Sequence, residues 1–337
     1  MTRKGPGATL ERQWLRRGPL AWALWPVSLV FGLLSGLHRK LYRLGVLQRQ
    51  RLRVPVIVVG NVVAGGAGKT PVVMALVEHL RARGLAAGVV SRGYGRNSVG
   101  CLEVTGATAP SDAGDEPLLI ARRCQVPVFV AARRAEAGRA LLNAYPRTQV
   151  IVADDGLQHH ALERDIEICV FDDRGAGNGW LLPAGPLRES WPRPVDLVLS
   201  TSLHGAVRGH AVRRLLADQA VRADGQRIAL DMLRGQPCDA VAGIARPEAF
   251  FDMLRVRGFR LRQTSALPDH YDFNSNISPM DGRHPLICTE KDAVKLWRIQ
   301  PAAWAVPLVL QIDAAFWTVL DSLLDAKLSS THGSETA

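Results

Sequence analysis

A glycine-rich segment that ends in a lysine and a threonine lies near residue 65 of this chain. Its six residues could together bind a nucleoside triphosphate: Gly65, Gly66, Ala67, Gly68, Lys69 and Thr70. Glycines let backbone N–H groups turn toward phosphate oxygens, the lysine bridges the β- and γ-phosphates, and the threonine hydroxyl binds Mg²⁺. The general pattern also requires glycine at position 63, where this chain has Val63. We still expect ATP and Mg²⁺ to bind here, because strand, loop and helix signals follow one another in the required order.

Two adjacent acids follow another apolar run, at Asp154 and Asp155. Residues 149–153 are typical of a buried strand, and the carboxyl edge of a parallel sheet is where P-loop enzymes place the acid that supports Mg²⁺. We therefore expect a metal-binding role here. The competing interpretation is a solvated turn, where acidic residues are also common.

Asp115 and His270 are candidates for moving a proton. An aspartate oriented by a histidine could accept the proton of an acceptor hydroxyl. Each residue also has a simpler interpretation, since Asp115 stands where a helix cap is expected and His270 lies in a loop. Their spacing in the sequence does not show that they meet. The segment 289–292 fits a helix-capping pattern.

The elements around these residues alternate between strands and helices. A strand at 54–60 and a helix at 71–84 flank the glycine-rich segment. Further strands are expected at 85–90, 126–130, 149–153, 167–171 and 197–200. This alternation predicts an α/β fold with a doubly wound, mainly parallel sheet.

Beyond residue 206 the pattern continues on a smaller scale. Strands at 241–244 and 286–289 and helices at 247–258 and 290–299 indicate a second, smaller α/β domain, joined through a Gly- and His-rich linker at 204–210. The chain is then expected to comprise a membrane-associated helix (1–46), a P-loop nucleotide-binding kinase domain (47–205), the smaller domain (206–328) and a disordered tail (329–337).

The N-terminal region combines an apolar stretch with positive charge. Residues 18–37 contain no charged side chain, which is long enough to span a bilayer. Residues 1–53 contain eleven Lys and Arg against one acid, so they account for nearly all of the net charge of +11. Basic residues on both flanks suit a helix lying in the membrane surface, or a hairpin broken at Pro26, as well as a spanning helix. This placement of charge favours anionic lipids over nucleic acid.

The five cysteines are widely spaced, and no CxxC pair occurs. Neither a zinc site nor a disulfide framework is therefore indicated, and reduced thiols packed in a core are expected.

The order of motifs along the chain resembles that of the tetraacyldisaccharide 4'-kinase family. The resemblance begins with the string at 60–71, a family signature that lacks the glycine replaced here by Val63. It continues at 91–95, 114–117, 154–159, 182–189, 242–244, 268–271 and 289–295. Leu157, where the family usually has phenylalanine, is a small departure that we interpret as a packing change.

This resemblance implies transfer of the ATP γ-phosphate to the 4'-hydroxyl of tetraacyldisaccharide 1-phosphate, forming lipid IVA in lipid A biosynthesis. It also implies a location on the cytoplasmic face of the inner membrane. The expected partners are this lipid A precursor and inner-membrane lipids, with no nucleic acid and no evident protein partner.

The resemblance further implies roles for individual residues. Asp115 resembles the catalytic base and His270 its partner, while Lys69 and Thr70 resemble the phosphate and Mg²⁺ contacts. Three acids resemble those around metal and nucleotide: Asp154, Asp155 and Glu189. Two arginines, Arg92 and Arg188, are candidates for binding phosphate, because a guanidinium group matches phosphate oxygens.

A regulatory or metal-chaperone NTPase at the membrane is the alternative, since it would use the same glycine-rich loop. Such a protein often has a Cys/His metal cluster, and the sequence shows no such pattern.

Overall fold

The structure, a computed structural model, describes residues 14–66, 68–202, 207–273 and 283–332. The chain divides into two compact units. The first comprises Met1–Arg92, Ala131–Val212 and Ile312–Ala337, and the second comprises Gly93–Val130 and Arg213–Gln311. This division differs from the expected consecutive domains, because each unit incorporates a segment distant in sequence. Of the expected linker at 204–210, residues 204–206 lie outside the described residues, and His210 already belongs to a strand.

The first unit is built on five parallel strands in the order β7-β6-β1-β5-β2. They are β1 (Val56–Gly60), β2 (Ala87–Ser91), β5 (Val150–Asp154), β6 (Ile166–Phe171) and β7 (Leu197–Ser200). Every residue of β1, β2 and β5 is buried, as expected where helices cover both faces of a sheet. The strand β8 (His210–Leu216) pairs with β7 and then continues into the second unit. The predicted doubly wound, mainly parallel sheet is confirmed.

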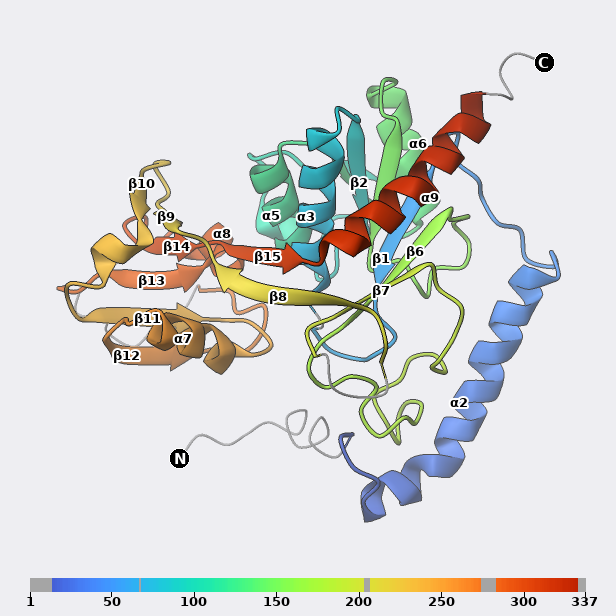
Figure 1. Ribbon diagram of the computed structural model, residues 1–337, viewed down its shortest axis with the longest axis horizontal. Coiled ribbons are helices and arrows are strands. Elements are labelled where there is room, and N and C mark those ends of the chain that lie inside the picture. Colours follow the sequence, from blue (N-terminus) through green and yellow to red (C-terminus); the bar gives the residue numbers. More distant parts are fainter. Residues whose placement is uncertain (1–13, 67, 203–206, 274–282, 333–337) are drawn as a thin grey trace. The chain divides into compact units, whose positions relative to one another are not determined.

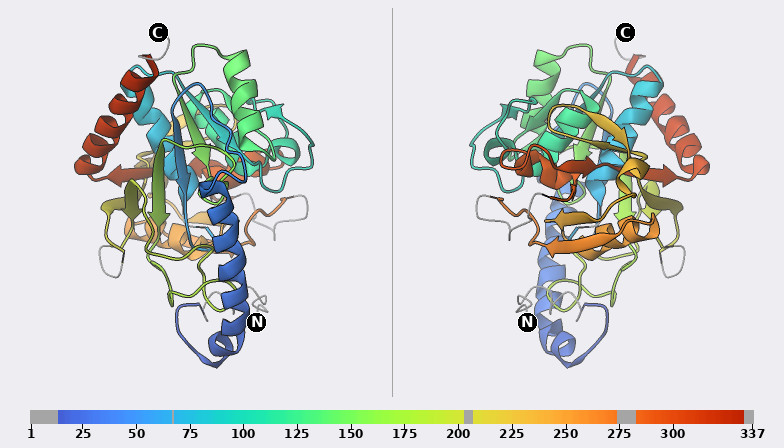
Figure 2. Two further views of the ribbon diagram at one scale, coloured as in Figure 1. Left: turned by 90° about the vertical axis from the view of Figure 1, so that its right-hand side faces the viewer. Right: turned by 90° about the vertical axis from the view of Figure 1, so that its left-hand side faces the viewer.

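Three helices pack on this sheet: α3 (Lys69–Ala82), α6 (Arg134–Ala144) and α9 (Ala314–His332). Figure 2 shows α3 and α9 on one face of the sheet and α6 on the other. The helix α3 begins two residues earlier than predicted, directly after the left-handed Gly68. The expected disordered tail is wrong for residues 329–332, because they continue α9 and Ser329 Oγ donates to the Asp325 carbonyl at 2.9 Å. Residues 333–337 lie outside the described residues.

The C-terminal helix α9 fixes the helix that follows the glycine-rich loop. Asp321 Oδ1 lies 2.8 Å from His79 Nε2 and accepts a hydrogen bond from Arg83 Nη1 at 3.0 Å. The His79 ring also stacks on Trp317, with 4.2 Å between ring centroids. The end of the chain therefore stabilises α3, which explains why α9 belongs to the first unit.

The N-terminal helix α2 (Pro19–Arg43) is continuous through Pro26, so the hairpin alternative is excluded (Figure 1). By length and composition alone, α2 could cross a membrane. Only Ala21 and Ser28 of this helix are buried, whereas apolar side chains such as Leu33 and Leu34 are exposed. The helix therefore contacts the rest of the first unit through only a small part of its surface.

The second unit contains a mixed six-stranded sheet in the order β10-β9-β14-β13-β11-β12. The strands are β9 (Gln219–Val221), β10 (Arg227–Ala229), β11 (Cys238–Ala242), β12 (Leu261–Ala266), β13 (Leu286–Thr289) and β14 (Trp304–Val306). Strands β11 to β14 pair in parallel, and β9 is antiparallel to both of its neighbours. The predicted smaller α/β unit is present, with an antiparallel edge that was not expected.

The helices of the second unit include α7 (Pro247–Val256) and α8 (Glu290–Leu296), both predicted. The remaining elements are β3 (Leu102–Glu103), α4 (Pro110–Ala113), α5 (Asp115–Cys124), β4 (Val128–Val130), the 3₁₀ turn η1 (Leu230–Leu233) and β15 (Leu308–Ile312). An ion pair of 2.6 Å between Arg123 of α5 and Glu290 of α8 joins the 93–130 segment to this unit. The cysteines are free thiols, and four of the five are buried, as expected.

Candidate active site

The glycine-rich loop leaves β1 at Asn61 and enters α3 at Lys69. The side chain of Asn61 is fully buried, and its amide group donates to the Val63 carbonyl at 2.6 Å. Its Oδ1 accepts a hydrogen bond from Lys69 Nζ at 3.3 Å. Gly65 and Gly68 have φ values of 93° and 74°, which glycine adopts without strain. The hydrogen bonds of the buried Asn61 side chain thus fix the conformation of the loop, and Gly65 and Gly68 allow its turns.

Val63 shows why the missing glycine does not prevent this loop from forming. It makes an isolated antiparallel bridge with Leu187, so its backbone is extended, and its side chain is buried. Any residue type can adopt an extended conformation, so glycine is not required at this position. Thr70 is 8% exposed in the first turn of α3, where backbone N–H groups favour anions. Ala67 lies outside the described residues.

The two strand-end acids lie in different environments. Asp154 ends β5, is 2% exposed, and accepts a hydrogen bond from Ser91 Oγ at 3.4 Å. Asp155 follows with φ at 47°, and its oxygens lie 3.4 Å from Lys69 Nζ and 3.6 Å from Arg188 Nη1. The structure therefore brings together Lys69, Asp155 and Arg188. Asp155 does lie in a turn and is partly exposed, but it is ion-paired, whereas Asp154 is buried in the strand.

Arg134, at the start of α6, stabilises the backbone at these two acids, where Asp155 has a left-handed conformation. It is buried, and its guanidinium donates to the carbonyls of Asp154 at 3.3 Å and Asp155 at 2.6 Å. Burial by itself raises the pKa of the Asp155 carboxyl, but the positive charges of Lys69, Arg188 and Arg134 outweigh it and lower that pKa. Asp155 therefore remains a carboxylate. A left-handed non-glycine residue stabilised in this way is typical of functional sites.

In the second unit, Asp115 is the first residue of α5. It follows Gly114, whose φ is 86° and where a Cβ atom would lie 2.8 Å from the Tyr94 carbonyl oxygen. Asp115 does not cap the helix. Instead its Oδ2 lies 3.0 Å from His270 Nδ1, so these two predicted residues meet.

Two lysines on α8 complete this group, and sequence reasoning missed both. Lys295 Nζ lies 2.8 Å from Asp115 Oδ2 and donates to the His270 carbonyl at 3.2 Å. Lys291 Nζ lies 2.8 Å from Asp269 Oδ1 and 3.4 Å from His270 Nε2. Their spacing of four residues places both on one face of the helix, and this was the available signal.

The capping prediction for 289–292 is nevertheless confirmed, since the Thr289 side chain accepts a hydrogen bond from the Asp292 backbone. The same short helix thus carries both a cap and the two lysines that contact Asp269 and Asp115.

The surroundings keep Asp115 ionised. Burial raises the pKa of its carboxyl, but hydrogen bonds from His270 and Lys295 outweigh that effect and lower the pKa. His270 has φ at 61°, a left-handed conformation that is uncommon for a residue other than glycine. A buried carboxylate oriented by histidine and lysine is suited to accept a proton from a hydroxyl group.

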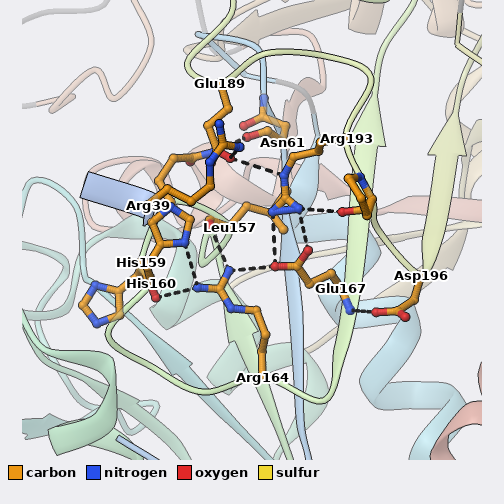
Figure 3. Close-up of polar contacts among 12 residues, drawn as sticks. Arg39, Asn61, Leu157, His159, His160, Arg164, Glu167, Glu189, Arg193 and Asp196 are labelled. Carbon is orange, nitrogen blue, oxygen red and sulfur yellow. Dashed lines mark hydrogen bonds and ion pairs between the residues drawn. The ribbon is translucent and has the colours of Figure 1, made fainter. Parts of the chain in front are cut away.

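Glu189 has different partners from those expected of a metal ligand. It is 5% exposed, and its oxygens lie 2.9 Å from Gln158 Nε2, 3.3 Å from Arg193 Nε and 3.4 Å from Arg39 Nη1 (Figure 3). These contacts indicate that Glu189 holds neighbouring side chains in position. Arg92 is exposed at the end of β2.

Among the described residues, no group of three or more His, Cys, Asp or Glu side chains is placed to hold a metal ion. Mg²⁺ commonly binds through one or two carboxylates together with substrate phosphates and water, so it does not need such a cluster. The hydroxyl of Thr70 and the carboxylates of Asp154 and Asp155 are hard oxygen donors that suit this ion.

Comparison with known proteins identifies the family to which this chain is similar. A model of the tetraacyldisaccharide-1-P 4'-kinase family, LpxK, matches residues 20–328. The tetraacyldisaccharide 4'-kinase of Acidovorax ebreus (strain TPSY) is 59% identical over 325 residues, covering 96% of each chain. That of Polaromonas naphthalenivorans (strain CJ2) is 57% identical over 339 residues, covering 97% of this chain and 98% of the relative.

A solved structure is also similar. The "apo" form of LpxK from Aquifex aeolicus in complex with ATP superimposes with a TM-score of 0.79 at 27% identity, covering 90% of this chain and 99% of that one. With the family model and the relatives matching nearly the whole chain, this protein belongs to the tetraacyldisaccharide-1-P 4'-kinase family.

Proposed function

We propose that this chain transfers the γ-phosphate of ATP to the 4'-hydroxyl of tetraacyldisaccharide 1-phosphate, forming lipid IVA in lipid A biosynthesis. Membership of the kinase family supports the reaction, and the ATP named for the Aquifex aeolicus structure supports the nucleotide. The observation that carries the proposal is the Asp115–His270 contact of 3.0 Å, because it supplies a buried base for an acceptor hydroxyl. A metal-chaperone NTPase is not favoured, since the described residues hold no metal cluster.

The first unit carries the residues that we propose bind the nucleotide. The loop N–H groups and Lys69 bind the β- and γ-phosphates, and Arg188, held by Asp155, reaches toward phosphate oxygens. Thr70 with Asp154 or Asp155 would hold Mg²⁺, which neutralises charge on the β- and γ-phosphate oxygens when bound. Glu189 is left out of this set, because its oxygens already face two arginines and Gln158.

The second unit carries the residues that we propose act on the acceptor. Asp115 accepts the proton of the 4'-hydroxyl, and His270 and Lys295 orient the carboxylate. Phosphoryl transfer depends mainly on positioning and charge stabilisation, so a base of modest strength suffices. We also assign Arg92, an exposed residue of the first unit, to a phosphate of the lipid, because a guanidinium group matches phosphate oxygens.

A direct assay tests the reaction. Purified protein is incubated with labelled ATP, Mg²⁺ and tetraacyldisaccharide 1-phosphate, and the expected result is a bis-phosphorylated lipid. Steady ATP hydrolysis without lipid, and no labelled lipid when it is added, would instead identify the regulatory NTPase.

We further propose that the enzyme works on the cytoplasmic face of the inner membrane, where α2 and its basic flanks contact lipid. The exposed apolar side chains of α2 and the charge of residues 1–53 support this location. Removing residues 1–46 is expected to release the protein from anionic vesicles in a flotation assay. Equal retention of the truncated and full-length proteins would show that the anchor lies elsewhere.

Replacing Lys295 by methionine is expected to move the acidic limb of the kcat/KM profile to higher pH. The base acts only when deprotonated, so activity falls as pH decreases through its pKa. Lys295 is one of the groups that lower the pKa of Asp115, and without it the loss of activity starts at a higher pH. Lys295→Arg retains the positive charge and should keep the limb close to that of the parent protein. If both variants had the parent's acidic limb, Lys295 would not influence the base.

A further inference from the structure

Glu189 lies in the first unit between the helix α2 and the side chains of Gln158 and Arg193. One oxygen accepts a hydrogen bond from Gln158 at 2.9 Å, and the other lies near Arg39 of α2 and Arg193. Figure 3 shows Arg39 and Arg193 converging on this carboxylate beside Asn61. Arg193 is held in turn by Glu167, which places one guanidinium between two acids. A buried carboxylate with these partners organises its surroundings.

From Glu189 the contacts continue to the phosphate loop. Gln158 Nε2 donates to the Asn61 carbonyl at 3.0 Å as well as to Glu189. Asn61 in turn accepts the hydrogen bond from Lys69 and donates to the Val63 carbonyl. Three residues therefore connect Arg39 of α2 to the lysine that binds phosphate: the side chains of Glu189 and Gln158, and then Asn61 through its backbone carbonyl and its side chain.

The backbone next to Glu189 also contacts the phosphate loop. Ala64 N donates to the Pro186 carbonyl at 2.7 Å, and Arg188 N donates to the Val62 carbonyl at 2.7 Å. With the bridge between Val63 and Leu187, residues 186–188 pair with the loop like a short strand. A shift of this segment would therefore move the loop with it.

The helix α2 docks on this same part of the chain. Ser28 Oγ donates to the Leu181 carbonyl at 2.9 Å and accepts from the Ala184 backbone at 2.9 Å. A Cβ atom at Gly32 would lie 2.7 Å from Leu181 Cδ1, so the helix approaches closely there. Ser28 and Arg39 are thus two points at which α2 holds residues 181–189.

We propose that Arg39 and Glu189 are positioning residues through which α2 holds the phosphate loop in its nucleotide-binding shape. Phosphoryl transfer then depends on α2 being seated at the membrane surface, where the acylated acceptor resides. This inference rests on the proposed kinase function for its kinetic test, but its nucleotide-binding test is independent of the acceptor. The exposed apolar side chains of α2, such as Leu33 and Leu34, would contact the membrane directly. The membrane would thereby fix the position of α2, and with it the contacts that run from Arg39 to Lys69.

The test compares Arg39→Met, Glu189→Gln and the double variant in full-length protein bound to vesicles of phosphatidylethanolamine and phosphatidylglycerol. Arg43→Met is the matched control, because it removes the same charge from an exposed position of the same helix. Each single variant should raise the KM for ATP about tenfold, and the double variant should be no more than about twofold worse, since coupled neighbours are not additive. The KM for the lipid and vesicle retention should not change.

Binding of a fluorescent ATP analogue should weaken in parallel, and this measurement stands even if no lipid product forms. Arg39→Lys, which keeps the charge, should recover part of the affinity and serves if Arg39→Met folds poorly. An unchanged KM with a lower kcat would mean that the residues only stabilise the fold, and the inference would be lost. Additive effects, or Arg39→Met behaving like Arg43→Met, would equally refute it. A wild-type protein that binds nucleotide but makes no lipid product would count against the proposed function instead.

Discussion

Asp115→Asn is expected to lower kcat about 10²- to 10⁴-fold, the usual contribution of a positioned base, while changing the KM for ATP by less than about twofold. Asparagine has nearly the same shape but cannot accept a proton. In the structure Asp115 contacts His270 at 3.0 Å and Lys295 at 2.8 Å, so its carboxylate is oriented rather than solvated. Steady-state kinetics with labelled ATP and the lipid acceptor measure the effect.

A matched control lies three residues earlier. Asp112 is exposed on α4, so Asp112→Asn makes the same chemical change outside the buried contacts and should leave kcat unchanged. If Asp115→Asn instead abolished ATP binding, Asp115 would be a nucleotide-binding residue. If its kcat equalled that of the control, another group would have to remove the proton.

The central sheet could be predicted because its strands carry a continuous apolar signal. Strands β1 and β5 are buried along their whole length, so each appears in the sequence as an uninterrupted apolar run. Strand β12 contains the polar residues 262–265 and is mostly half-buried, so it gives no such run. The short edge strands β9 and β10 were missed for the same reason.

Local chemistry was also visible, but contacts between distant residues were not. The loop ending in Lys69 and the acids after β5 are contiguous in sequence. By contrast, 155 residues separate Asp115 from His270, and 150 separate Arg39 from Glu189. No local pattern reveals that Glu189 faces α2. Val63 broke the general rule because its bridge to Leu187, a tertiary contact, keeps the backbone extended.

Lys69→Met is expected to lower kcat/KM for ATP about 10³-fold, within the range reported for removing one cation from a phosphoryl-transfer site. Lys69 is the cation placed on the loop itself, where Nζ lies 3.3 Å from Asn61 Oδ1 and 3.4 Å from Asp155 Oδ1. Methionine preserves the length of the side chain but cannot bind phosphate. Steady-state kinetics and binding of a fluorescent ATP analogue measure the loss.

Stability separates this catalytic effect from a folding defect. Among the charges that lower the pKa of Asp155, Lys69 is the largest, so its removal raises that pKa. Arg188 and Arg134 remain as partners, and Asp155 should therefore stay ionised at neutral pH, with little change in thermal stability. As pH falls, the parent should lose more stability than the variant, because the lowered folded pKa of Asp155 contributes stability only while the carboxylate is ionised, and the variant has less of that contribution to lose. A large loss of stability at neutral pH would mean that Lys69 holds the loop together, whereas unchanged kcat/KM would place the phosphates away from this lysine.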